Sequence, residues 1–207
     1  KVSGGLHGVG AAVVNALSVH MRAEIHRDGG KFVQEYKNGG KPMGKTKKEG
    51  ASKANGTIIT FEADESIFTE VKFDFDTIVS HLRQQAYLVK GLRIAIMDLR
   101  EAGKVDDTSV ICLRDLGIDA PSTSFYFEGG LKSLVSFQNR HQTAVHKNIF
   151  YVEKEQDGVM VEVALQYVDD FSSRLSAFAN NIHTAEGGMH VTGFKTALTR
   201  TLNNASK

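Results

Sequence analysis

The chain has 207 residues, enough to bury a sizeable core in one domain or in two small ones. With 41% hydrophobic and 24% charged residues, it has the composition of an ordinary globular protein. Its net charge of +1 argues against a strongly basic nucleic-acid binder and against a protein held at a membrane surface by charge.

The single cysteine, Cys112, excludes an internal disulfide and any zinc site built from several cysteines, and it fits a reducing compartment. No apolar run approaches the roughly 20 residues that span a bilayer. No histidine spacing is typical of a metal site. We therefore expect a cytoplasmic protein without a membrane segment or a bound zinc ion.

The first 18 residues combine a glycine-rich stretch, SGGLHGVG at residues 3–10, with an apolar helix. Backbone N–H groups at a glycine-rich turn that opens a helix can bind an anion, and phosphate is the natural candidate. The stretch is not a Walker A loop, because no Gly-Lys-Ser/Thr follows. Alone, G-x-x-G-x-G fits a tight turn into a helix equally well. The predicted inner face of the helix consists of Val9, Ala12, Val13, Ala16 and Leu17.

Residues 23–27 and 31–36 are predicted to be two strands of a hairpin, because residues 28–30 (DGG) have turn chemistry. Residues 38–55 are rich in glycine and lysine. They predict a solvated, mobile loop, with a DNA-binding patch as the alternative. Residues 57–61 are apolar and β-branched, which predicts a buried strand.

The next predicted helix has Phe75, Ile78, Val79, Leu82 and Ala86 on its inner face. Asp74 or Asp76 is placed to cap it and Gly91 to end it. A strand at 92–99 follows, and residues 100–123 are interpreted as a surface insertion without an assigned function. A helix over 129–139 precedes a polar run at 139–143, where we expect the domain boundary.

Beyond the boundary, residues 149–155 and 159–168 predict a hairpin across the turn at 156–158. Alternating apolar residues on its second strand imply one buried face. A strand at 175–181 and a helix over about 188–202 complete the chain.

Several stretches resemble, in the same order, the B-type ATPase subunits of type IIA topoisomerases, those of gyrase and topoisomerase IV, in the GHKL family. The glycine-rich stretch resembles the ATP lid of this family. The other matching stretches are 56–61 (GTIITF), 128–132 (EGGLK), 148–151 (NIFY), 161–167 (VEVALQY), 178–182 (FANNI), 186–190 (EGGMH) and 193–200 (GFKTALTR).

The resemblance implies an α/β fold of the two-layer α+β kind, with a mixed sheet covered by helices. Residues 1–140 would be the later part of a GHKL ATPase domain, beginning within the ATP lid. Residues 141–207 would be the first part of a transducer domain with its own sheet. Because position 1 is Lys and lies inside a motif, we expect the chain to lack its natural beginning.

The resemblance also implies how ATP would be bound. The lid would wrap the triphosphate with backbone N–H groups, and Lys1 would balance its charge. Thr57 matches a threonine that organises water and the adenine-binding carboxylate in the family, although alone it is typical of a β-branched strand residue. The expected nucleotide-binding residues are Lys1, Gly5, Leu6, His7, Gly8, Val9, Gly10 and Thr57.

Two further functional assignments come from the resemblance. Arg27 matches the arginine that aminocoumarin antibiotics contact at the mouth of the ATP pocket, with an ordinary exposed arginine as the alternative. Lys195 and Arg200 would face a DNA cavity in the transducer, with a solvated helix face as the alternative.

The family's catalytic base, its Mg²⁺-binding asparagine and its adenine-reading aspartate match no segment of this chain. The resemblance therefore implies that the chain carries no catalytic residue and no metal ligand. The parent protein would use ATP and Mg²⁺ to drive strand passage and negative supercoiling of double-stranded DNA. It would dimerise on binding ATP and assemble with the gyrase A subunit. The alternatives are a topoisomerase IV subunit and a non-catalytic module that binds DNA or a partner.

Overall fold

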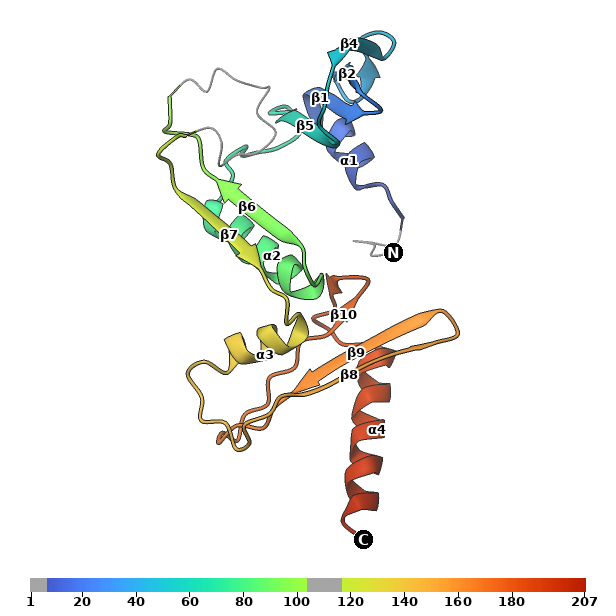
Figure 1. Ribbon diagram of the computed structural model, residues 1–207, viewed down its shortest axis with the longest axis vertical. Coiled ribbons are helices and arrows are strands. Elements are labelled where there is room, and N and C mark those ends of the chain that lie inside the picture. Colours follow the sequence, from blue (N-terminus) through green and yellow to red (C-terminus); the bar gives the residue numbers. More distant parts are fainter. Residues whose placement is uncertain (1–6, 104–116) are drawn as a thin grey trace. The chain divides into compact units, whose positions relative to one another are not determined.

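The computed structural model describes residues 7–103 and 117–207 (Figure 1). The described residues form two compact units. One contains residues 7–75 with 98–103 and 117–120, and the other contains residues 76–97 and 121–207. The first is called here the N-terminal unit and the second the C-terminal unit.

The N-terminal unit is built on antiparallel strands around one hairpin. Strand β1 pairs with β2 on one side and with β5 on the other, and both short strands β3 and β4 pair with β2. The predicted hairpin is confirmed. Its elements are α1 (Gly10–Ala16), β1 (Ser18–Arg27), β2 (Gly30–Lys37), β3 (Lys41–Pro42), β4 (Lys47–Ala51) and β5 (Gly56–Ala63).

The prediction of a loop throughout residues 38–55 is wrong, because β3 and β4 lie within it. Every residue of β4 is exposed, so no apolar alternation marks this strand in the sequence. Backbone hydrogen bonds to β2 hold it, and Lys47 and Lys48 are typical of a strand at a sheet edge.

The two faces of this sheet differ in chemistry. Residues that pair directly across strands share a face, so Ile25 and Thr57 lie on one face together with Ile59 and Phe61. The other face carries the alternating polar side chains of β1. The prediction that residues 57–61 are fully buried is wrong, since Ile59 and Phe61 are 47% and 43% exposed.

The core of the C-terminal unit lies between helix α2 and strand β7. Tyr87 is buried and stacks on Phe127, with ring centroids 3.8 Å apart, and Arg83 lies over the ring of Phe125. Strand β7 pairs antiparallel with β6, and Gly91 follows the predicted helix in a left-handed conformation. These elements are α2 (Phe75–Leu88), β6 (Arg93–Met97), β7 (Ser122–Tyr126) and α3 (Leu131–Gln138).

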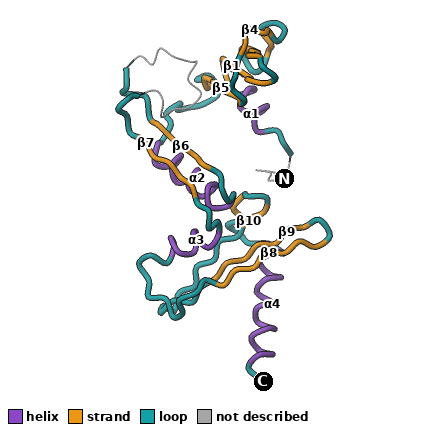
Figure 2. Tube along the Cα trace, viewed as in Figure 1, coloured by secondary structure: helices purple, strands orange, loops and turns teal. Residues whose placement is uncertain are grey.

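The second predicted hairpin is also confirmed, as a two-stranded ribbon of β8 and β9 (Figure 2). The prediction of a buried face on its second strand is wrong, because Val159 and Val161 are 63% and 52% exposed. The predicted strand at 175–181 shortens to β10. The elements are β8 (Phe150–Gln156), β9 (Val159–Leu165), β10 (Phe178–Ala179), β11 (Ile182–His183) and α4 (Met189–Ala205).

Lys90, which follows α2, contacts the β8–β9 hairpin. Its ammonium group bonds the Tyr151 hydroxyl and lies 3.2 Å from a carboxylate oxygen of Glu153. Burial, with hydrogen bonds to Glu153 and Glu162, raises the pKa of Tyr151 to about 12, although Lys90 opposes the shift. The lysine stem passes over Gly130, where an added Cβ would meet Lys90 Cγ at 2.7 Å.

The α/β fold class is confirmed. The expectation of a mixed sheet is wrong for the described residues, because their strands pair in antiparallel fashion throughout. The expected boundary between residues 1–140 and 141–207 remains a prediction. Most of the insertion expected at 100–123, including Cys112, lies outside the described residues.

The hairpin turn of the N-terminal unit provides a stability test. Asp28 and Gly29 have φ of 52° and 74°, the left-handed pair of a type I′ turn. We expect Gly29→Ala to lower the free energy of unfolding by about 1 kcal/mol, because a Cβ is disfavoured at this φ. Urea unfolding followed by circular dichroism measures the change.

Gly10→Ala is the matched control, because Gly10 begins a helix and nothing lies within 4 Å of an added Cβ. This substitution should be neutral or stabilising. Equal stability of the two variants would contradict the assigned turn.

Candidate functional site

The glycine-rich loop before α1 is exposed. His7, Gly8, Val9 and Gly10 all face solvent, and Gly8 has φ of 64° with nothing within 4 Å of an added Cβ. Val13 N–H donates to the Val9 carbonyl. By helix geometry the N–H groups of the preceding turn have no acceptor within the helix. The loop therefore has the conformational freedom and the open space that close approach of an anion requires.

Helix α1 has only seven residues, and none of them is buried. A dipole this short adds little, so any hold on an anion depends on the loop N–H groups themselves. The other nucleotide-binding residues expected nearby, Lys1, Gly5 and Leu6, lie outside the described residues.

The structure brings Thr57 and Arg27 to one end of the sheet. Thr57 is exposed and pairs with Ile25, two residues before Arg27, so the three side chains share a face. The Arg27 side chain is 74% exposed and donates to a carboxylate oxygen of Asp28 at 3.0 Å. Helix α1 joins β1 at Ser18, at the opposite end of the strand.

Arg27 lines an open hollow of about 770 Å³. Its cationic and amide groups, from Arg27, Lys53 and Asn55, suit a ligand rich in hydrogen-bond acceptors. The other lining residues are Asp28, Gly29, Ser52 and Ala54.

Lys195 and Arg200 are both exposed on α4. Five positions apart, they point about 140° away from each other around a helix of 3.6 residues per turn. Their role at DNA remains a prediction.

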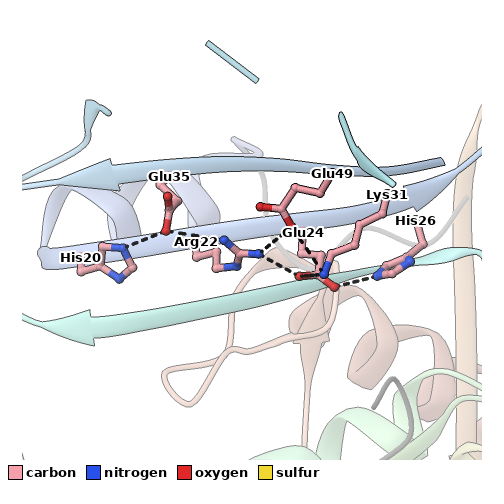
Figure 3. Close-up of polar contacts among 7 residues, drawn as sticks. All are labelled: His20, Arg22, Glu24, His26, Lys31, Glu35 and Glu49. Atoms are coloured by element: carbon pink, nitrogen blue, oxygen red, sulfur yellow. Dashed lines mark hydrogen bonds and ion pairs between the residues drawn. The ribbon is translucent and has the colours of Figure 1, made fainter. Parts of the chain in front are cut away.

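A buried carboxylate organises the polar face of the sheet (Figure 3). Glu24 is only 2% exposed, and its oxygens lie 2.8 Å from His26 Nε2, 3.0 Å from Lys31 Nζ and 3.2 Å from Arg22 Nη2. Burial alone would raise the pKa of this carboxyl, but the hydrogen bonds from His26, Lys31 and Arg22 lower it below its ordinary value.

Two further glutamates complete this network. Glu49 on β4 lies 3.3 Å from Arg22 and 3.6 Å from Lys31. Glu35 on β2 lies 3.5 Å from Arg22. The network therefore joins β1, β2 and β4 through side chains as well as through backbone hydrogen bonds.

The Glu24 network was not predicted from the sequence. The available signal is the polar alternation of His20, Arg22, Glu24 and His26 along β1, which places four polar side chains on one face. Lys31 and Glu49 come from other strands, so their part depends on the pairing register.

No group of three or more His, Cys, Asp or Glu side chains within residues 7–103 and 117–207 is arranged to hold a metal ion. The helices in the same ranges are too short or too polar to cross a membrane.

The sequence of the chain is similar to those of known topoisomerase subunits. The profile of the DNA gyrase B family matches residues 130–207. The whole chain is 44% identical to the B subunit of DNA gyrase from Halalkalibacterium halodurans over 208 aligned residues. The chain belongs to the DNA gyrase B family. It is also 39% identical over its whole length to the B subunit of DNA topoisomerase 4 from Staphylococcus aureus.

The chain spans about 30% of the length of the H. halodurans gyrase protein and 29% of the S. aureus protein. A solved structure of the 43K ATPase domain of Thermus thermophilus gyrase B, in complex with an aminocoumarin, superposes with a TM-score of 0.79. That match has 28% sequence identity and covers 96% of this chain and 50% of the other. The resemblance to this family is thereby confirmed.

The buried carboxylate gives a stability prediction. We expect Glu24→Gln to cost about 3 kcal/mol of unfolding free energy at pH 7, because the partly buried cations of Arg22 and Lys31 lose the anion that balances them. The exposed Glu62 on β5 is the matched control, and Glu62→Gln should change stability by less than about 0.5 kcal/mol. Urea unfolding measures both.

The pH dependence of this stability follows from the lowered pKa of Glu24. The Glu24 contribution is complete above its ordinary pKa of 4.5 and is lost as pH falls through the lower folded value. The difference in unfolding free energy between the wild type and Glu24→Gln should therefore become smaller below about pH 4.5. A difference in unfolding free energy that stays constant down to about pH 3 would contradict the stabilising role of the ionised Glu24.

Proposed function

We propose that this chain is part of an ATP-hydrolysing B-type protein of a gyrase-like topoisomerase and contributes part of the nucleotide site. The observation that carries the proposal is the exposed loop at residues 7–10, in a chain that aligns over its whole length with gyrase B proteins. The left-handed Gly8 and the open space around it suit a backbone that wraps a phosphate.

The residues of this chain that would hold ATP lie in the loop and on β5. Backbone N–H groups from Gly5 to Gly10 would bind the phosphates, Lys1 would balance their charge, and Thr57 would order water near the adenine. When bound, ATP supplies the phosphoanhydride whose cleavage powers the conformational cycle. The chain itself supplies no Mg²⁺ ligand in this proposal, because the resemblance places that asparagine upstream of Lys1.

The parent protein would use ATP binding to dimerise and would couple hydrolysis to strand passage and negative supercoiling of double-stranded DNA. The gyrase A subunit would be its partner in a cytoplasmic heterotetramer. ATP binding biases such a machine between open and closed gates. Lys195 and Arg200 are the residues proposed to contact DNA phosphates.

Arg27 is proposed as an aminocoumarin contact. Support comes from its place in the hollow described above and from the aminocoumarin in the T. thermophilus structure. Most of its side chain is free to approach a ligand, although Asp28 competes for its Nε–H group.

A topoisomerase IV protein is the second candidate, and the 39% identity to the S. aureus protein favours it. A non-catalytic module that binds DNA or a partner is the third. Sequencing the gene upstream of Lys1 separates the enzymes from the module, because only the enzymes require a glutamate base and a metal-binding asparagine there.

The 207-residue chain should show no Mg²⁺-dependent ATP hydrolysis above background. Phosphoryl transfer needs a positioned water and charge stabilisation by a metal ion, and the proposed base and metal ligand lie outside this sequence. A phosphate-release assay measures turnover. Robust turnover that Gly8→Ala abolishes would contradict this assignment of the catalytic residues.

ATP should bind the isolated chain weakly or below detection, because the proposed adenine-reading carboxylate lies upstream. Isothermal titration calorimetry tests this, with Gly8→Ala as the comparison for loop binding. Submicromolar affinity would mean that the loop alone suffices, contrary to the proposal.

A further inference from the structure

The segment from Ser52 to Asn55, called here the crossing segment, connects strands on opposite sides of the β1–β2 hairpin. Strand β4 lies beside β2, and β5 lies beside β1. Ala51 pairs with Gly30, and Gly56 pairs with His26. The chain must therefore pass the whole hairpin between these two residues.

This passage leaves little slack. Three strand spacings amount to about 14 Å. The five residue steps from Ala51 to Gly56 reach at most about 17 Å when fully extended. Because the segment must be almost fully extended, holding Ser52 in place also restricts the positions of the residues that follow it.

Ser52 is fixed at three points. Its N–H donates to the Gly29 carbonyl at 3.0 Å, its Oγ lies 2.7 Å from His26 Nδ1, and its Oγ accepts the Ala54 N–H at 3.1 Å. His26 is 6% exposed, and its Nε2 lies 2.8 Å from the buried Glu24. A chain of hydrogen bonds therefore runs from a buried carboxylate to the backbone of the crossing segment.

The donors and acceptors in this series of hydrogen bonds fit one tautomer of the His26 ring. With its hydrogen on Nε2, the ring donates to the Glu24 carboxylate, and Nδ1 accepts the Ser52 hydroxyl hydrogen. The Ser52 oxygen is then free to accept the Ala54 N–H. Each hydrogen atom in this series of hydrogen bonds, from Glu24 to Ala54, has one acceptor.

We propose that Glu24 and His26 are positioning residues that act through Ser52 to hold the crossing segment as one wall of the hollow beside Arg27. All four residues of the crossing segment line that hollow. The ligand class that fits is an acceptor-rich anion, which Arg27, Lys53 and Asn55 would recognise. The ligand part of this inference rests on the proposed function of Arg27.

The test compares three variants of the 207-residue chain by nuclear magnetic resonance. Ser52→Ala removes the hydroxyl, Ser52→Thr restores it, and Ser66→Ala is the matched control. Ser66 also bonds through its hydroxyl, to Asp64, but away from the hollow. The readouts are Ala54 amide exchange, the ¹⁵N signals of the His26 ring, and amide shifts at 27–29 and 52–55 on adding an aminocoumarin.

Ser52→Ala should speed Ala54 exchange by roughly fivefold, as expected for one lost hydrogen bond. It should shift the His26 Nδ1 signal and weaken aminocoumarin binding by about the same factor. Ser52→Thr should restore all three readouts, and Ser66→Ala should change none. Unchanged exchange and ring signals in Ser52→Ala would overturn the positioning role.

Failure of Ser52→Thr to restore any readout would also overturn the positioning role of Glu24 and His26. If the wild-type chain shows no shifts with the aminocoumarin, the ligand role of Arg27 fails. The positioning role is then decided by amide exchange and the ring signals, so the two failures are distinguishable.

Discussion

The N-terminal unit depends on one buried carboxylate, Glu24, and the three hydrogen-bond donors around it. Removing an ion from water costs several kcal/mol, and only well-placed opposite charges and hydrogen bonds offset that cost. Arg22 and His26 approach from the same strand, and Lys31 comes from β2. Correct pairing of the hairpin is therefore a condition for burying this charge at all.

Local sequence chemistry was sufficient to predict both hairpins and the main helices. The Asp-Gly turns at Asp28 and Asp157 have the left-handed φ values that their residue types allow, and Gly91 follows helix α2 as expected. Burial was harder to predict, because alternation along a strand identifies an apolar face without saying what covers it. Val161 belongs to the predicted alternating strand and Ile59 to the predicted buried strand, yet both side chains are about half exposed.

The candidate site divides in the same way. The glycine-rich loop stands out by its own pattern, whereas only the family resemblance points to Thr57 and Arg27, and the roles of all three remain predictions. The Glu24 network and the crossing segment could not be predicted from the sequence, because they depend on which residues face each other across the four strands β1, β2, β4 and β5. Strand β4 has only exposed residues, so no periodic pattern marks the edge that supplies Glu49.

Well-packed apolar residues in place of Glu24 and all of its partners would stabilise the sheet at least as well, because buried ion networks are weak sources of stability. What the buried ions contribute is a preference for one register of strand pairing over the others. A slip of one residue would turn Glu24 to the face of Ile25 and Thr57, away from Lys31 and Glu49. The same slip would move Arg27 and His26 to opposite faces from those they occupy. The buried charge thus enforces the one pairing that leaves Arg27 at the hollow and His26 beneath the crossing segment.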